Sequence, residues 1–313
     1  MLPDDSGDDN NQEDSEQLKE SRMQFFYCLV AVIALTFINV SIPVFTIAVV
    51  IIWPLPVVYL ALHQGQRRAV MMIVMAAVIN GLLFSPLMSI TTVVGFGFIG
   101  FVMAGGLIEK FTPRRVLFMT VGAAILSNLI LSGILISTYE QGLEAGFAGM
   151  LEELVGPLMG EEELSPLIQM QMRLITQLLP ALLIISGAIT GILNYYFVHW
   201  FLRLKNIDVI PFKSIAYWRF PAALLSAGAV IGLLFRDRPS MFNLAAVVFF
   251  LIFLQGFGVG LYYTVRKTSS MIFRWIYILA VLIIPVVPVA LLAVGLLDLW
   301  LDFRRIAFSR GED

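Results

Sequence analysis

Residues Ile90–Ile108 read ITTVVGFGFIGFVMAGGLI, an uncharged run that is long enough to cross a bilayer as a helix. Inside it, Gly95–Gly100 matches the G-x-G-x-x-G pattern that binds a dinucleotide where a strand meets a helix. A dinucleotide site also needs an acidic residue about 20 positions further on, and this chain reads RRVLFMTVGA there. The apolar context and the missing carboxylate favour helix packing over NAD or FAD binding, so we expect no cofactor.

The rest of the chain is similarly apolar. Of its 313 residues, 59% are hydrophobic and 13% are charged, whereas soluble domains carry about 25% charged residues. Apolar segments recur at 23–42, 44–62, 69–86, 89–108, 116–138, 174–202, 220–235, 241–265 and 272–300. The sequence therefore predicts an all-α fold, a polytopic transmembrane helical bundle with about 8–10 membrane segments.

Charged residues divide the chain into four predicted regions. Residues 1–20 are acidic and polar and should form a disordered cytoplasmic tail, and residues 21–138 hold the N-terminal membrane helices. Residues 139–172 contain glutamates but no Lys or Arg, so we expect an extracytoplasmic loop that can form an interfacial helix. Residues 173–313 hold the C-terminal membrane helices and end in a basic amphipathic segment. The basic loops, including 203–219, belong on the cytoplasmic side.

The last apolar segment, 272–300, leaves two topologies open because it contains Pro285 and Pro288. Proline breaks the hydrogen-bond ladder of a helix. A hairpin that turns at these prolines would return the C-terminus to the cytoplasm, in keeping with the charge rule, whereas one kinked span would place it outside. We favour the hairpin.

Two clusters of glycine are expected to let membrane helices approach closely. The first holds Gly95, Gly97 and Gly100, and the second holds Gly256, Gly258 and Gly260. Small residues on one helix face allow the backbones of two helices to come into contact, where dispersion and weak hydrogen bonds hold them. We therefore predict glycine-rich helix packing at both places.

Four side-chain amides lie within the predicted helices, at Asn80, Asn128, Asn194 and Gln255. An amide in hydrocarbon must find hydrogen-bond partners, because an unmet polar group costs a few kcal/mol. Two roles stay open for these residues. They can join helices to one another, or they can form a candidate polar pocket for a small-molecule substrate.

The C-terminal stretch DLWLDFRR holds the candidate residues for docking a partner. Asp298 and Asp302 are four residues apart and share a helix face, and Arg305 is placed to pair with Asp302. Three roles stay open: an amphipathic end at the membrane interface, docking to a cytoplasmic or membrane partner subunit, and a proton or cation site.

No catalytic or metal-binding motif is visible in the sequence. Cys28 is the only cysteine, which excludes a disulfide within the chain and a zinc or iron–sulfur site built on cysteines. The only histidines are His63 and His199, both near predicted helix ends, and no G-K-[ST] phosphate-binding motif occurs. We therefore expect no catalytic residues, no bound metal, no enzyme activity and no nucleic-acid partner.

Three stretches resemble the YybS-like family of bacterial polytopic membrane proteins: ALHQGQRRAV at 61–70, GFGFIGFVMAGGLIEK at 95–110 and GLLDLWLDFRR at 295–305. That family is distantly similar to the substrate-capture subunits of energy-coupling-factor transporters and to the cell-shape protein MreD. The resemblance implies a multi-pass protein of the bacterial cytoplasmic (inner) membrane, in contact with the lipid bilayer. It further implies a non-enzymatic subunit that captures or transports a small metabolite, or alternatively a membrane scaffold for envelope or cell-shape machinery.

Overall fold

The computed structural model describes residues 6–137, 166–235, 238–268 and 270–304, and all regular structure in these ranges is helical. The helices are α1 (Ser6–Ser41), α2 (Thr46–Ile52), α3 (Pro54–Gln64), α4 (Gln66–Leu83), α5 (Pro86–Ile90), η2 (Thr91–Gly97), α6 (Phe98–Ile108), α7 (Pro113–Ser137), α9 (Pro166–Leu204), α10 (Ala222–Leu234), α11 (Pro239–Lys267), α12 (Met271–Ile283) and α13 (Val286–Leu301), with short 3-10 turns at Pro43–Phe45 and Ile215–Tyr217. Within the described ranges, seven spans are long and apolar enough to cross a membrane, or eight if α12 and α13 form one broken span. The predicted all-helical transmembrane fold is confirmed.

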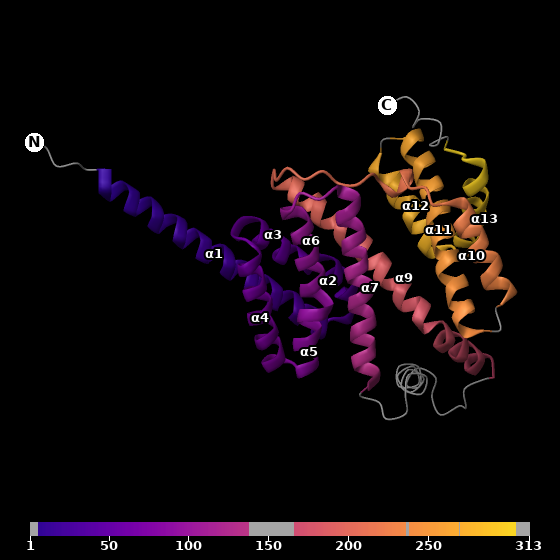
Figure 1. Cartoon of the computed structure of the whole chain (residues 1–313), viewed down its shortest axis with the longest axis horizontal. Coiled ribbons are helices and arrows are strands. Elements are labelled where there is room, and N and C mark those ends of the chain that lie inside the picture. Colours follow the sequence, from indigo (N-terminus) through magenta and orange to yellow (C-terminus); the bar gives the residue numbers. More distant parts are fainter. Residues whose placement is uncertain (1–5, 138–165, 236–237, 269, 305–313) are drawn as a thin grey trace, which may run out of the picture. The chain divides into compact units, whose positions relative to one another are not determined.

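The chain forms two compact units, which are described separately (Figure 1). Unit 1 comprises Met1–Tyr139 and Ser186–Pro211, and unit 2 comprises Glu140–Ile185 and Phe212–Asp313. Helix α9 contributes its first half to unit 2 and its second half to unit 1.

The structure describes most of the predicted N-terminal tail but little of the predicted acidic loop. Helix α1 begins at Ser6, so much of the tail that we expected to be disordered continues the helix of the first span, because a helix that has already nucleated extends easily through Glu, Gln and Lys. Most of the predicted acidic loop 139–172 lies outside the described residues, and its position remains a prediction.

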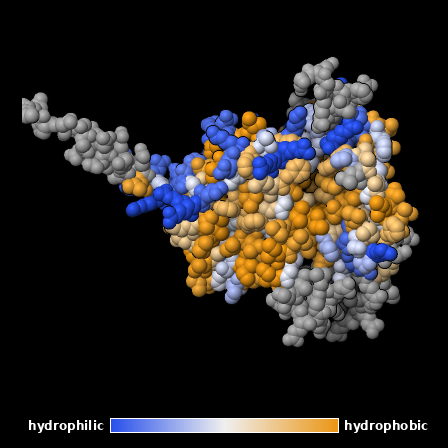
Figure 2. Space-filling model, in the orientation of Figure 1, coloured by the Kyte–Doolittle hydropathy of each residue, from blue (hydrophilic) through white to orange (hydrophobic). Residues whose placement is uncertain are grey.

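Hydrophobic side chains cover the outer sides of the helices, as lipid contact requires. Figure 2 shows them over the visible sides of unit 1, with hydrophilic side chains gathered at one end of that unit. Leu82 is 83% exposed and Ile47 is 74% exposed. Such exposure would be unfavourable in water but costs nothing against lipid tails, so both residues fit a surface that faces the bilayer.

The second span of unit 1 is broken by proline. Pro54 has no N–H, so it cannot donate to the Val50 carbonyl four residues earlier, and α2 ends at Ile52 while α3 begins at Pro54. The span Pro86–Ile108 contains a second irregularity, the π-helix η2. At its end the Phe98 N–H donates to the Val93 carbonyl, five residues earlier. Unit 1 therefore has a helix discontinuity in each of two spans that contact each other.

The predicted glycines all lie against another part of the fold. An added Cβ would meet Leu131 at Gly95, Ile73 at Gly97, Val57 at Gly100, Leu291 at Gly256, Ile215 at Gly258 and Tyr277 at Gly260. The contact of Gly256 is the tightest, because it faces the backbone carbonyl of Leu291, and Gly295 on the opposite helix faces the carbonyl of Ile252. Helices α11 and α13 thus meet backbone to backbone in unit 2.

Two G-x-x-x-G pairs that we did not single out make contacts of the same kind. An added Cβ would lie 2.6 Å from the Ile125 Cα at Gly187 and 2.6 Å from the Val121 Cα at Gly191, so α9 touches the backbone of α7. On α10, Gly232 faces the backbone of α11 at Ala245, and Gly228 faces the Val248 side chain of the same helix. The four-residue spacing of small residues was readable in the sequence as a packing signal.

The break at Pro285 turns the chain back within unit 2. Helices α12 and α13 are bent by 105°. The Tyr277 hydroxyl near the middle of α12 donates to the Phe257 carbonyl (3.0 Å), and the Tyr263 hydroxyl near the end of α11 donates to the Phe303 carbonyl (2.9 Å). The end of α13 therefore lies beside the end of α11, and the side of the membrane on which the C-terminus lies stays a prediction.

Candidate functional site

A hydrogen-bonded group of buried polar side chains in unit 1 lies between the two helix discontinuities. It consists of Thr36 on α1, Trp53 at the α2–α3 break, Asn80 on α4 and Thr92 on η2, and we call it the Asn80 cluster. All four residues are at most 1% exposed. Four separate segments of the chain are needed to bring these polar groups together.

The hydrogen-bond directions in the Asn80 cluster follow from donor and acceptor counts. The hydroxyls of Thr36 and Thr92 donate to carbonyls of their own helices, those of Val32 (3.0 Å) and Met88 (2.7 Å). Both hydroxyl oxygens are therefore acceptors, and the Asn80 Nδ2 donates to Thr36 (3.1 Å) and to Thr92 (2.9 Å). This arrangement fixes the orientation of the Asn80 amide.

One atom of the Asn80 cluster is left without a partner. The indole Nε1 of Trp53 donates to the Thr36 hydroxyl at 3.1 Å, so every donor in the cluster is used. The Asn80 Oδ1 is buried and accepts no hydrogen bond from the described residues. A buried acceptor without a donor costs roughly 1–3 kcal/mol. The cluster is thus ready to accept one N–H or O–H group from outside the described chain.

An aromatic contact links the two discontinuities beside this acceptor. The ring of Trp53 stacks on the ring of Phe96 in η2, with centroids 5.0 Å apart and planes inclined by 26°. π-Helical turns often occur at functional sites, and discontinuous helices form the substrate and ion sites of many transporters. Both the location of the Asn80 cluster and its free acceptor therefore fit a binding site.

The other predicted amides of unit 1 join helices. When the Asn194 amide is oriented with its nitrogen toward the α2–α3 break, it donates to the carbonyls of Val50 (3.0 Å) and Ile51 (3.2 Å). Asn194 thereby supplies the donor that Pro54 lacks. Asn128 donates to the Ser186 hydroxyl at 3.0 Å and connects α7 to α9. Asn80, Asn128 and Asn194 have different partners and do not share one pocket.

A second asparagine bonds the backbone beside a proline in unit 2. Pro180 lies inside α9, and the side chain of Asn243 sits between one backbone group before the proline and one after it. Its Oδ1 accepts from the Ala181 N–H (2.9 Å), and its Nδ2 donates to the Gln177 carbonyl (2.8 Å). We did not single out Asn243, although an isolated amide early in an apolar segment was a readable signal.

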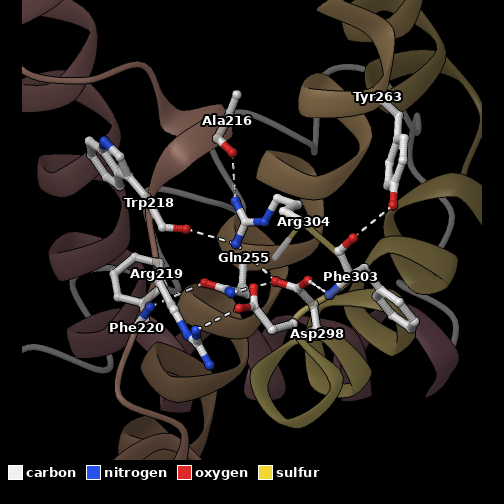
Figure 3. Close-up of polar contacts among 10 residues, drawn as sticks. Ala216, Trp218, Arg219, Phe220, Gln255, Tyr263, Asp298, Phe303 and Arg304 are labelled. Atoms are coloured by element: carbon white, nitrogen blue, oxygen red, sulfur yellow. Dashed lines mark hydrogen bonds and ion pairs between the residues drawn. The ribbon is translucent and has the colours of Figure 1, made fainter. Parts of the chain in front are cut away.

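The polar group of unit 2 is built around a buried ion pair (Figure 3). The guanidinium of Arg304 lies 2.8 Å from the Asp298 carboxylate, and both side chains are fully buried. Gln255 donates to the same carboxylate at 2.6 Å, and the Phe303 N–H donates to its other oxygen at 2.9 Å. Three donors thus surround Asp298, and we call these residues the Asp298 network.

The Asp298 network holds an irregular segment of backbone. Arg304 donates to the carbonyls of Ala216 (2.7 Å) and Trp218 (2.8 Å), and the Gln255 Oε1 accepts from the Phe220 N–H (3.2 Å). These backbone groups precede α10 and have no helical partners, and non-helical backbone at membrane depth is tolerated only when protein groups satisfy it. Arg304 and Gln255 therefore fasten the segment before α10 to α11 and α13.

The predicted docking residues are engaged within unit 2. Asp298 is 1% exposed, and Asp302 pairs with Arg219 at 2.9 Å. Arg305, the partner that we expected for Asp302, lies outside the described residues. Arg304, which we did not single out, is the cation at the centre of the network. A basic residue shortly after Asp298 in the sequence indicated that an ion pair was possible. Which acidic residue Arg304 pairs with depended on the fold.

No group of three metal-binding side chains occurs in the part of the chain that the structure describes. Each histidine instead bonds to the carbonyl four residues earlier on its own helix, His63 to Tyr59 (2.9 Å) and His199 to Tyr195 (2.8 Å).

Long apolar spans, lipid-facing sides and buried polar groups between helices define a polytopic helical membrane protein. Within that class, the chain belongs to the family described as "Predicted membrane protein (DUF2232)", which matches residues 29–299. The matched range includes Asn80, Gln255 and Asp298 and ends before Arg304. Neither a search of curated proteins nor a search of solved structures finds a match.

Proposed function

We propose that the protein is a non-enzymatic membrane subunit that captures a small solute, with the Asn80 cluster as the place where the solute is held. The resemblance to YybS-like proteins supports this proposal, as does their more distant similarity to the substrate-capture subunits of energy-coupling-factor transporters. A small-molecule substrate and a bacterial inner membrane location belong to the same proposal.

The unpartnered Oδ1 of Asn80 is the observation that carries the proposal. A polar solute with an N–H or O–H group would complete the hydrogen bonding of the cluster, and it would meet the stacked rings of Trp53 and Phe96 beside it. Helix discontinuities on two sides allow the local backbone to open with less loss of hydrogen bonds than in a regular helix. A fully satisfied amide would only join helices.

Capture of a solute against a gradient would require an energy source outside this chain. The sequence has no G-K-[ST] motif for binding nucleoside phosphates. The proposal therefore includes a partner subunit that supplies this energy.

The test is mass spectrometry of small molecules that co-purify with the protein from mild detergent. We expect one compound to be enriched over empty micelles in the wild type and in Asn128→Ala, and to be lost in Asn80→Ala. Asn128 is a matched control because it is also an amide of unit 1 but is not part of the cluster. Equal recovery from Asn80→Ala, in a sample that elutes as folded protein, would reject the site.

Unit 2 supports a second candidate, a membrane scaffold for envelope or cell-shape machinery. Its centre is filled by the Asp298 network and by the backbone contact of Gly256 with α13. A rigid, filled unit suits binding to another protein more than holding a solute. Co-purification of a membrane protein in stoichiometric amount, with no enriched small molecule, would favour this candidate over capture.

A further inference from the structure

A cavity outside both polar groups lies at the C-terminal end of α9, within unit 1. Its volume is about 480 Å³, and it is lined by Tyr196, His199, Trp200, Arg203, Leu204 and Pro211. That size falls within the range of small-molecule sites, roughly 300–1,000 Å³. The lining combines two amphipathic aromatic residues, a cation and an imidazole at the end of a membrane helix, the zone where such side chains meet lipid headgroups.

His199, one of the residues that line the cavity, has a ring nitrogen without a hydrogen-bond partner among the described residues. Its Nδ1 lies 2.8 Å from the Tyr195 carbonyl, and since a carbonyl can only accept, Nδ1 carries the proton. In the neutral ring the other nitrogen, Nε2, is then an acceptor. This Nε2 is buried and has no partner among the described residues, and His199 as a whole is 1% exposed. A ligand would have to supply the donor.

Arg203 supplies a positive charge one helical turn further on. It is exposed, and no ion pair with it occurs within the described part of the chain. An unpaired guanidinium at a membrane interface suits a phosphate, which it can bind through two parallel hydrogen bonds. The same charge disfavours an ammonium group in so small a cavity. The donor that His199 requires is therefore more compatible with a hydroxyl.

We infer that this cavity binds a phosphate group with a hydroxyl a few bonds away, as in a phosphoglycerol. Arg203 binds the phosphate, His199 Nε2 accepts from the hydroxyl, and Tyr196 and Trp200 cover the apolar part next to the headgroup. The same chemistry can come from an anionic phospholipid or from a soluble phosphate ester. This site is separate from the Asn80 cluster and does not depend on the proposed capture function.

Lipid titration of the full-length protein in mild detergent, followed by native mass spectrometry, tests the site. Phosphatidylglycerol should bind about tenfold more tightly to the wild type than to Arg203→Ala, as expected for loss of one charge-assisted contact. Lys205→Ala is the matched control, because Lys205 carries the same charge two residues away but does not line the cavity. Equal weakening in both variants would mean general surface attraction and would overturn the inference.

The hydroxyl is tested with phosphatidylmethanol, which has the same phosphate but no free hydroxyl. The wild type should prefer phosphatidylglycerol, and His199→Phe, which keeps an aromatic ring beside Tyr195, should bind the two lipids equally. A wild type that does not distinguish the lipids would overturn the role of Nε2 and the inference with it.

Glycerol 1-phosphate separates the two sources of the ligand. Displacement of phosphatidylglycerol by this soluble ester would support the site and identify a soluble phosphate compound as its ligand. Binding of the lipid without displacement would support the site and identify the membrane as the source. Binding of neither probe above the level seen with phosphatidylcholine would overturn the inference.

Discussion

Arg304 lies 2.8 Å from Asp298, and neither side chain has any contact with solvent. Charges inside a membrane protein are expensive and persist where they are paired or functional. Here the pair has a structural role, because Arg304 also holds the carbonyls of Ala216 and Trp218. Replacing Arg304 with a neutral residue should therefore remove hydrogen bonds from the segment before α10 as well as from the Asp298 carboxylate.

Breaking this pair from one side should destabilise the protein strongly. Arg304→Met leaves Asp298 buried without its cation and two carbonyls without donors, so we expect a loss of roughly 3–5 kcal/mol. The double variant Asp298→Leu/Arg304→Met should recover part of that loss, because no uncompensated charge remains. Thermal unfolding of the purified protein in detergent measures both. A single variant as stable as the wild type would contradict the prediction.

The backbone contact between α11 and α13 should not tolerate a methyl group. Gly256→Ala places a carbon against the Leu291 carbonyl, and Gly295→Ala places one against that of Ile252, so each should cost roughly 1–3 kcal/mol through forced separation of the helices. Gly122→Ala is the control, since its added methyl meets nothing within 4 Å and alanine favours a helix. The measurement is the melting temperature of each of the three variants. If Gly122→Ala lowers it as much as the other two do, the backbone contact between α11 and α13 is not the cause of the loss.

The repair of the Pro54 break by Asn194 predicts a rescue. Asn194→Leu leaves the Val50 carbonyl without a donor and should lower stability by roughly 1–3 kcal/mol. In the Asn194→Leu background, Pro54→Ala should restore part of the loss, because the alanine introduced there has an N–H that can reach the Val50 carbonyl. Folded yield and melting temperature give the readout. Additive losses in the double variant would show that the two residues act independently.

The return of α13 alongside α11 predicts the side of the C-terminus. Residue 313 should lie on the same side of the membrane as Lys267. We expect that side to be the cytoplasm, because the neighbouring loops are positively charged. A fluorescent-protein fusion at the C-terminus should glow, and a phosphatase fusion there should be inactive. In a Cys28→Ala background, a cysteine at position 161 should react with an impermeant reagent on intact cells. An active phosphatase fusion would exclude the hairpin.

The sequence by itself determined that this chain is a bundle of membrane helices. The length of each apolar run, its few charges and its prolines are local properties of the sequence. They act within one segment, through the transfer of apolar side chains from water to lipid and through the hydrogen bonds of the helix. The same reasoning identified the glycines at 95, 97 and 100 as packing residues, and it marked Asn80, Asn194 and Gln255 as amides that needed partners. The pairs at Gly187–Gly191 and Gly228–Gly232 carried the same signal and were readable too.

Only the tertiary structure decided which polar groups meet. Arg304 reaches Asp298, Asn194 reaches the Val50 carbonyl and Asn80 keeps one free acceptor, and each result depends on segments far apart in the sequence. A buried polar group gains most of its stability from the particular atoms placed opposite it, and small shifts of a helix change those atoms. Local pattern can say that an amide or a charge must find a partner, whereas the arrangement of the helices selects which one it finds.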